Sequence, residues 1–222
     1  MDTIIQILAR ELGRSEAHVE NVVRLIDEGN TIPFIARYRK ELHGAMDDTA
    51  LRTLADRLQY LRNLDKRREE VKSAIEGQGK LTEELSAAID AAATLAEVED
   101  LYRPYRQKRR TRATVAREKG LEPLAELLFA QAADGPAPEE AAGAFVDPEK
   151  GVETAEDALQ GASDIIAERI SDDADIRKRL RELVWKKGYL VSAAAAKEPE
   201  DTVYRLYYAF RSPLNRVQGH QV

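Results

Sequence analysis

The sequence contains no cysteine and only one tryptophan in 222 residues. The absence of cysteine excludes disulfides, thiol nucleophiles and cysteine-ligated zinc, and it agrees with a reducing, cytoplasmic environment. No apolar run approaches the roughly eighteen residues that a membrane-spanning helix needs, so no membrane partner is predicted. The first residues, MDTIIQILARELG, do not resemble a signal peptide, because they lack a basic start and charged residues interrupt their apolar run.

Motifs of catalysis and of cofactor binding are also missing. The sequence has no HExxH, GxSxG, Walker A or GxGxxG pattern. Its three histidines lie far apart in the chain and suit surface or packing positions. The acidic pairs Asp47–Asp48 and Asp172–Asp173 stand at expected helix starts, where capping and the helix dipole explain them. We therefore predict no enzyme activity, no cofactor and no metal site.

Charged and helix-forming residues are what the chain has in quantity. Charged residues make up 33% of the sequence and hydrophobic residues 43%, which is typical of a folded globular protein with a heavily charged surface. Alanine is abundant and runs of β-branched residues are rare, which favours helix. We therefore predict an all-α, or mainly α, array of many helices, with at most one short strand near residues 188–196.

Two short helical patterns joined by a turn open the chain within residues 1–45. The first is expected to begin behind Asp2 and the second behind Ser15, because both side chains can accept hydrogen bonds at a helix start. Gly29 suits the end of the second helix, where the backbone often turns left-handed. Two such helices resemble either a helical hairpin or part of a helix-turn-helix. The predicted inward residues are Ile4, Ile5, Leu8, Leu12, Val19, Val22, Val23 and Ile26.

A third helical segment, TIPFIARYRKELHG, follows. Pro33 fits its first turn, where the missing N–H costs nothing. Arg37 and Lys40 project away from the apolar side of this segment, and we predict that they contact a nucleic-acid ligand. The predicted inward stripe comprises Phe34, Ile35, Tyr38 and Leu42.

Residues 46–222 are predicted to form a helical central part that begins with one long helix. Asp47 or Asp48 is expected to cap this helix, which reaches to about Gly77 and would be roughly 45 Å long. Residues 65–70, DKRREE, contain nothing apolar, so this stretch is predicted to cross solvent or a shallow interface. Near the end, EDTVYRLYYAF predicts a short aromatic-rich helix. The predicted packing positions of the long helix are Leu51, Leu54, Leu58 and Leu61.

The most unusual stretch is YRPYRQKRRTRATVAREKG, residues 102–120. It holds eight Lys or Arg and one acid, so its formal charge is +7 in a chain of −6, and the remainder sums to −13. Such a cluster attracts phosphates irrespective of sequence, and the attraction falls with salt. Tyr102 and Tyr105 could stack on unpaired bases, which suits RNA or single-stranded DNA better than a duplex groove. The candidate contacts are Arg103, Arg106, Lys108, Arg109, Arg110 and Arg112.

The same stretch also has a purely structural interpretation. The acidic remainder offers many partners, so Arg103 or Arg106 could be tied into internal ion pairs. The two tyrosines could equally anchor a core. Both interpretations stay open from the sequence alone.

Several long segments resemble the Tex family of bacterial transcription accessory proteins. They are TIPFIARYRKELHGAMDD, VEDLYRPYRQKRRTRATVAREKGLEPLA and VDPEKGV, and the match continues through YRLYYAFRSPLNRVQGHQV. The motifs occur in the family's order and span essentially the whole chain, which makes the resemblance specific. The matching part is the helical amino-terminal region of the family.

The resemblance implies a cytoplasmic, multidomain protein that binds nucleic acid. In the family, the helical region with its helix-turn-helix-like start precedes an RNase-H-like domain, helix-hairpin-helix elements and an S1 RNA-binding domain. The chain would then be a fragment that stops before the RNase-H-like domain. Because the S1 domain is a principal nucleic-acid contact of the family, weak binding of RNA or single-stranded DNA is expected. No catalytic residue is implied.

Two functions are therefore considered. The first is a helical scaffold of a transcription accessory protein that assists binding of RNA or single-stranded DNA through its basic surface. The second is a protein-interaction module that docks on RNA polymerase or on the other domains of its own chain. The acidic remainder of the chain and the long charged helix motivate this alternative.

Overall fold

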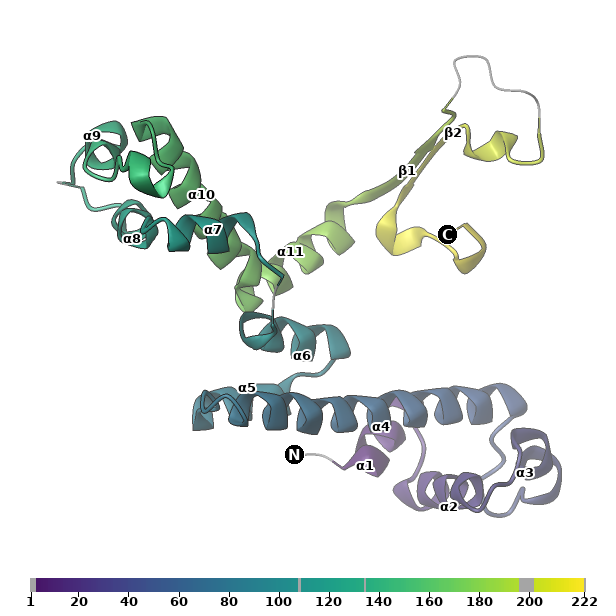
Figure 1. Cartoon of the computed structure of the whole chain (residues 1–222). Helices are drawn as coiled ribbons and strands as arrows, with labels where there is room; N and C mark the ends of the chain where they lie inside the picture. Colours follow the sequence, from purple (N-terminus) through teal and green to yellow (C-terminus); the bar gives the residue numbers. More distant parts are fainter. Residues whose placement is uncertain (1–2, 108, 134, 196–201, 222) are drawn as a thin grey trace. The chain divides into compact units, whose positions relative to one another are not determined.

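The computed structural model describes residues 3–107, 109–133, 135–195 and 202–221. These residues form eleven α-helices and one two-stranded antiparallel sheet, which confirms the predicted mainly α fold (Figure 1). The chain divides into two compact units, Met1–Val98 and Glu99–Val222, and each is described by itself. No helix in the described ranges has the length and apolar character needed to cross a membrane.

The helices follow one another with short connections. Those that begin in the first unit are α1 (Ile4–Leu12), α2 (Glu16–Asp27), α3 (Ile32–Tyr38), α4 (Asp48–Glu76), α5 (Glu83–Ala91) and α6 (Leu95–Tyr102), the last of which runs across the boundary. The elements of the second unit are α7 (Arg112–Glu118), α8 (Glu122–Ala130), α9 (Pro138–Gly143), α10 (Ala155–Asp172), α11 (Ala174–Lys187), β1 (Tyr189–Ala193) and β2 (Ala209–Pro213).

Side-chain caps fix the starts of the first helices. Thr3 accepts a hydrogen bond from the backbone N–H of Gln6, whose side chain accepts one in return from the N–H of Thr3. The cap of α1 is therefore Thr3, and Asp2, the predicted cap, lies outside the described residues. Ser15 accepts a 3.3 Å bond from the N–H of His18, as predicted for α2. The chain leaves α2 through Gly29, whose φ of +84° confirms the predicted left-handed turn.

The long helix α4 carries the core of the first unit. Asp47 caps it by accepting a 2.7 Å hydrogen bond from the N–H of Ala50. Helices α1, α2 and α3 pack along it (Figure 1), so residues 3–45 and α4 form one body. Its charged stretch, residues 65–70, borders a shallow interface, because Arg68 donates a 2.7 Å hydrogen bond to the carbonyl of Ala92. The buried side chains of α4 include all four predicted leucines: Leu51, Leu54, Leu58, Leu61, Leu64, Val71 and Ile75.

The predicted inward stripe of the third segment is wrong in two positions. Ile35 is fully buried, but Phe34 and Tyr38 are 36% and 57% exposed. The reason is the shortness of α3, which ends at Tyr38 and presents little more than the Ile35 side to α4. The turn that follows relies on Gly44, whose φ is +59° and whose position leaves no room for a Cβ beside the His18 ring.

The second unit is built around α10, which packs on α7, α8 and α9 (Figure 1). Thr154 and Asp157 form the predicted capping box at its start. Gly161 lets α10 approach closely, because a Cβ there would lie 2.3 Å from Cδ1 of Leu121. The core is rich in small residues and comprises Ala113, Ala116, Leu121, Leu124, Ala125, Ala141, Ala142, Val152, Ala158, Ala162 and Ile165.

A β-hairpin follows α11. β1 pairs with β2 in antiparallel fashion, with Val191 opposite Arg211. β1 confirms the predicted strand near residues 188–196, but the predicted limit of one strand is wrong. The segment EDTVYRLYYAF contributes a 3₁₀ turn, Arg205–Tyr207, and the start of β2 instead of the predicted helix. Its first two residues, Glu200 and Asp201, lie outside the described residues. Aromatic residues favour a strand once a partner strand is present, and β1 supplies that partner.

Candidate nucleic-acid interface

The basic stretch runs from the end of α6 through a loop and the whole of α7. Helix α6 ends at Tyr102, and a 3₁₀ turn around Pro104 occupies Arg103–Tyr105. Helix α7 begins only after Thr111, whose hydroxyl accepts a 3.1 Å hydrogen bond from the N–H of Thr114. The break at Pro104 follows from its missing N–H and fixed φ. The described residues of 106–110 belong to no helix or strand and are exposed, so the arginines among them reach solvent.

Three of the candidate residues are engaged in ion pairs. Arg103 contacts Asp172 at 2.8 Å, and this carboxylate is largely buried. Arg110 contacts Glu118 at 2.6 Å, but its side chain is 69% exposed. Arg112 is 86% exposed and lies 3.8 Å from Asp164. Water screens such exposed pairs, so only the Arg103 pair is expected to hold its side chain firmly.

Two other candidates, Arg106 and Arg109, are exposed and form no ion pair with any described residue. Both line a groove of about 490 Å³ together with Arg103 and Arg177. Lys108, the remaining candidate of this stretch, lies outside the described residues. The acidic residues that line the groove are Glu99, Asp100, Glu168 and Asp172.

Most of the acids in this groove are already neutralised by other arginines. Asp100 is buried and accepts hydrogen bonds from Arg177 at 2.5 Å and from Arg181. Asp172 is paired with Arg103. Sequence reasoning did not identify Asp100. In the sequence, the i,i+4 spacing of Arg177 and Arg181 indicates that both side chains lie on one face of a helix and could bind the same carboxylate.

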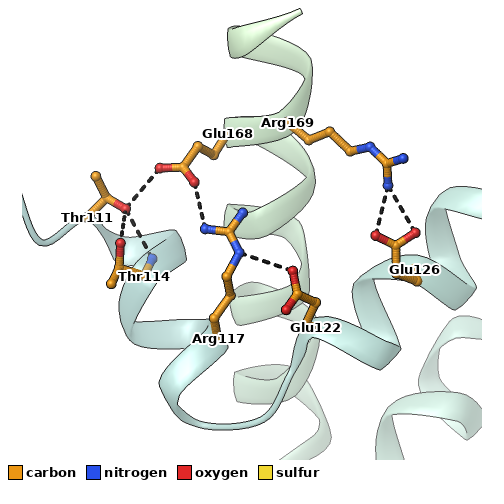
Figure 2. A network of polar contacts seen from close by, with 7 residues as sticks. All are labelled: Thr111, Thr114, Arg117, Glu122, Glu126, Glu168 and Arg169. Carbon is orange, nitrogen blue, oxygen red and sulfur yellow. Dashed lines mark hydrogen bonds and ion pairs between the residues drawn. The ribbon is translucent and has the colours of Figure 1, made fainter. Parts of the chain in front are cut away.

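Arg117, in the same basic stretch, has a structural role. It contacts Glu168 at 2.7 Å and Glu122 at 3.3 Å, and Thr111 donates a 3.0 Å hydrogen bond to Glu168 (Figure 2). The pKa of Arg117 lies above its ordinary value, chiefly because of the hydrogen bond to Glu168. These contacts join α7, α8 and α10 (Figure 2). Part of the positive charge of the stretch therefore stabilises the fold.

The aromatic residues of the stretch are not free platforms. Tyr102 and Tyr105 are half-buried, and both already interact with other residues of the chain. Stacking of unpaired bases on these two rings stays a prediction.

Arg37 and Lys40, the candidates of the first unit, are exposed and form no ion pair with any described residue. They belong to α3 and the turn behind it, which are part of the first unit.

No group of three or more metal-ligating side chains occurs within the described ranges. Three carboxylates that line the groove form ion pairs with arginine side chains instead: Asp100, Glu168 and Asp172. The geometry therefore offers cationic side chains for an anionic ligand.

Comparison with known proteins places two segments in family models. Residues 2–76 match the model described as the Tex-like protein N-terminal domain, and residues 134–222 match the model described as Tex central region-like. YdcI of Bacillus subtilis (strain 168) is 47% identical over 98% of this chain and 30% of its own length. The transcriptional accessory protein Tex of Neisseria gonorrhoeae is 40% identical over 98% of this chain and 28% of its own length.

A more distant relative occurs in Homo sapiens. The S1 RNA-binding domain-containing protein 1 is 29% identical over 99% of this chain and 22% of its own length. The chain thus spans less than a third of the length of these relatives.

Proposed function

Because the chain belongs to the Tex family, of which it carries the amino-terminal domain and the central region, we propose that it is a helical scaffold of a transcription accessory protein that assists binding of RNA or single-stranded DNA. The S1 RNA-binding name of the human relative supports this choice of ligand. The observation that carries the proposal is the exposure of Arg106 and Arg109 without carboxylate partners among the described residues.

Electrostatics support phosphate contact at this groove. Three of its four acids, Asp100, Glu168 and Asp172, are bonded to other arginines. Arg106 and Arg109 form no ion pair with any described residue, and Glu99 is the remaining acid of the groove. A guanidinium group holds a phosphate with two parallel hydrogen bonds, and each contact releases condensed counterions.

The test is a salt series of fluorescence anisotropy with a labelled single-stranded RNA. We expect Arg106→Gln/Arg109→Gln to weaken binding and to reduce the slope of log affinity against log salt by roughly 1.4, because about 0.7 is lost for each single-strand phosphate contact. The comparison variant is Arg110→Gln/Arg112→Gln, which removes the same charge from the same segment at positions with exposed carboxylate contacts, and we expect it to reduce the slope less than Arg106→Gln/Arg109→Gln does. The proposal would be overturned if the wild type bound no RNA, or if neither variant changed the slope of log affinity against log salt.

A second candidate function is docking of protein, and the exposed apolar side chains around α11 favour it. Trp185 is 60% exposed, and it lines a mainly apolar groove of about 490 Å³ with Leu180, Val184 and Leu214. Contiguous apolar surface of this kind marks interaction sites, and tryptophan is common at their centres. Under this proposal the surface docks on RNA polymerase or on other domains of the longer family proteins.

The docking candidate is tested by capture of purified RNA polymerase, and separately of the other domains, with the wild-type chain and Trp185→Ala. Retention by the wild type that Trp185→Ala loses supports docking. Failure of the wild type to retain either partner counts against it. The control is Phe129→Ala, which removes another exposed aromatic ring from the same unit.

We further propose a binding role without catalysis, in a cytoplasmic setting. The support is the pairing of the groove carboxylates with arginine side chains, which leaves them poorly placed to hold catalytic cations. Incubation of labelled RNA and DNA with the chain and Mg²⁺ tests this proposal. Cleavage above background would overturn it.

A further inference from the structure

Two aromatic rings stand exposed on the short helix α3. Phe34 and Tyr38 lie one helical turn apart, with ring centroids 5.2 Å from each other and planes inclined by 49°. The two rings therefore form a tilted aromatic pair on the surface of α3. Ile35 is the buried residue of α3, whereas both rings keep a substantial exposed surface.

Cationic side chains surround these rings. The guanidinium of Arg39 lies 5.5 Å from the centre of Phe34, and that of Arg37 lies 6.0 Å from the centre of Tyr38. Lys40 follows directly in the turn and is exposed. These three cations form no ion pair with any described residue.

The contrast with α4 in the same unit is informative. Every Lys and Arg of α4 contacts a carboxylate, including Arg57 with Glu11 and Arg62 with Asp27. The chain as a whole is acidic, so carboxylates are plentiful. The cations of α3 are left uncompensated beside exposed rings, and Glu41 is the one acid of residues 31–45. This combination points to an anionic ligand with flat apolar faces.

We infer that Phe34 and Tyr38, with Arg37, Arg39 and Lys40, form a stacking platform for unpaired nucleobases, hereafter the α3 platform. The inference rests on the proposed nucleic-acid-binding function and assigns it a second contact surface and a single-stranded ligand. Bases of a single strand stack on aromatic side chains, whereas the faces of paired bases are covered within a duplex. The three cations would neutralise the phosphates between the stacked bases. An acidic peptide would use these cations but not the ring faces.

The first test compares single-stranded and duplex oligonucleotides of about twelve nucleotides by fluorescence anisotropy. We expect Phe34→Leu/Tyr38→Leu to weaken single-strand binding by at least about fivefold, the lower end of the effect of losing one stacked base. Duplex affinity and the salt slope for the single strand should stay unchanged, because stacking releases few counterions. By contrast, Arg37→Gln/Lys40→Gln should reduce the salt slope.

The matched control is Phe129→Leu in the second unit. Phe129 is 42% exposed and lies under the guanidinium of Arg169 at 4.3 Å, so its surroundings resemble those of Phe34. Arg169 differs in being paired with Glu126 at 2.9 Å. We expect this control to bind the single strand like the wild type. An equal loss in the control and in Phe34→Leu/Tyr38→Leu would overturn the inference.

The outcomes separate the α3 platform from the proposed function. If Arg106→Gln/Arg109→Gln weakens binding but Phe34→Leu/Tyr38→Leu does not, the proposal of base stacking on the α3 platform is overturned. The proposal of phosphate contact at the groove of the second unit is then supported. If only Phe34→Leu/Tyr38→Leu weakens binding, base stacking on the α3 platform is supported and phosphate contact at the groove is overturned. If the wild-type chain binds no oligonucleotide, both are overturned. A polyglutamate peptide that binds with the same dependence on both rings would identify an acidic protein segment as the occupant instead.

A crosslinking experiment keeps the inference testable if the double variant fails to fold. The wild-type chain is irradiated with a 5-bromouracil single strand, and the adducts are located by mass spectrometry. Adducts on Phe34 or Tyr38 support the platform. Adducts confined to other segments overturn it.

Discussion

Asp100 is a single carboxylate that joins the second-unit part of α6 to α11. It is one of two buried polar side chains among the described residues and accepts hydrogen bonds from Arg177 and Arg181. We expect Asp100→Ala to lower the free energy of unfolding by about 1.5–3 kcal/mol, because two charge-assisted bonds are lost. The partly exposed arginines regain water, so the cost stays below that of a fully buried pair.

Urea denaturation checks this prediction at the residue scale. The control is Glu118→Ala, which removes an exposed carboxylate from Arg110 and should change stability by less than about 0.5 kcal/mol. Equal midpoints for Asp100→Ala and the wild type would show that the two bonds add nothing to stability.

Gly161 gives a second prediction at this scale. A Cβ at this position would lie 2.3 Å from Leu121 and 3.3 Å from Ala116, both in the core of the second unit. We expect Gly161→Val to destabilise the unit by about 1–3 kcal/mol through overpacking between α10 and α7. Gly143→Val is the control, because nothing lies within 4 Å of a Cβ there. Thermal unfolding followed by circular dichroism distinguishes the two variants, and identical shifts would contradict the packing argument.

At the scale of elements, two forked ion pairs hold α4 against α1 and α2. Arg57 donates two 2.7 Å hydrogen bonds to Glu11, and Arg62 donates bonds of 2.7 and 2.8 Å to Asp27. The bond from Arg57 is the main cause of a Glu11 pKa below its ordinary value of 4.5. The bond from Arg62 likewise lowers the pKa of Asp27 from its ordinary value of 3.8.

These pairs predict a loss of stability in acid. Each folded-state pKa is depressed, so the stabilisation is complete above the ordinary values of 4.5 and 3.8 and is lost as pH falls through the lower folded-state values. Because the side chains are partly exposed, the two pairs together should contribute about 1 kcal/mol. Urea midpoints of the wild type and Glu11→Gln/Asp27→Asn should differ near neutral pH, and the difference should shrink as the pH falls below 3.8 and both carboxylates become protonated in the folded state. A difference that stays constant over this range would contradict this account.

Helix starts were predictable from the sequence because capping is a local effect. Ser15, Asp47 and Thr154 each bond to a backbone N–H three residues ahead, so a short window contains the whole interaction. The exposure of Phe34 was not predictable in this way, because it depends on where α3 ends and how α4 packs on it. β2 was missed for a related reason, since its conformation depends on pairing with β1.

The candidate interface was predictable only as a charged segment. The excess of arginine in residues 102–120 is visible in composition, as is the break at Pro104. Which arginine is neutralised depends on carboxylates of α10 far along the chain, since Arg103 and Asp172 are 69 positions apart. Sequence patterns do not specify such pairings, so Arg103 and Arg106 looked equivalent until their neighbours were known.

At the scale of the whole molecule, a destabilising substitution in the core of one compact unit should leave the stability of the other unit unchanged. Leu54 is fully buried in the first unit and Leu124 in the second. Truncating either to alanine removes about 2–5 kcal/mol of stability from its own core. We expect Leu54→Ala to raise amide hydrogen exchange in α1, α2 and α4 while α8 and α10 keep their protection. Leu124→Ala should do the opposite, and a uniform rise across both units would show that they unfold together.

The attachment of α11 through Asp100 has a mechanical consequence. This helix of 14 residues is roughly 21 Å long and leads into β1 at its far end. The two arginines that bond Asp100 are the fourth and eighth residues of this helix, so only about half of its length lies beyond the contact, toward the hairpin. A rotation of about 10° about this contact would move the end of α11 by roughly 2 Å, because the part of the helix beyond the contact is about 12 Å long. The position of the hairpin is therefore expected to amplify small changes at Asp100.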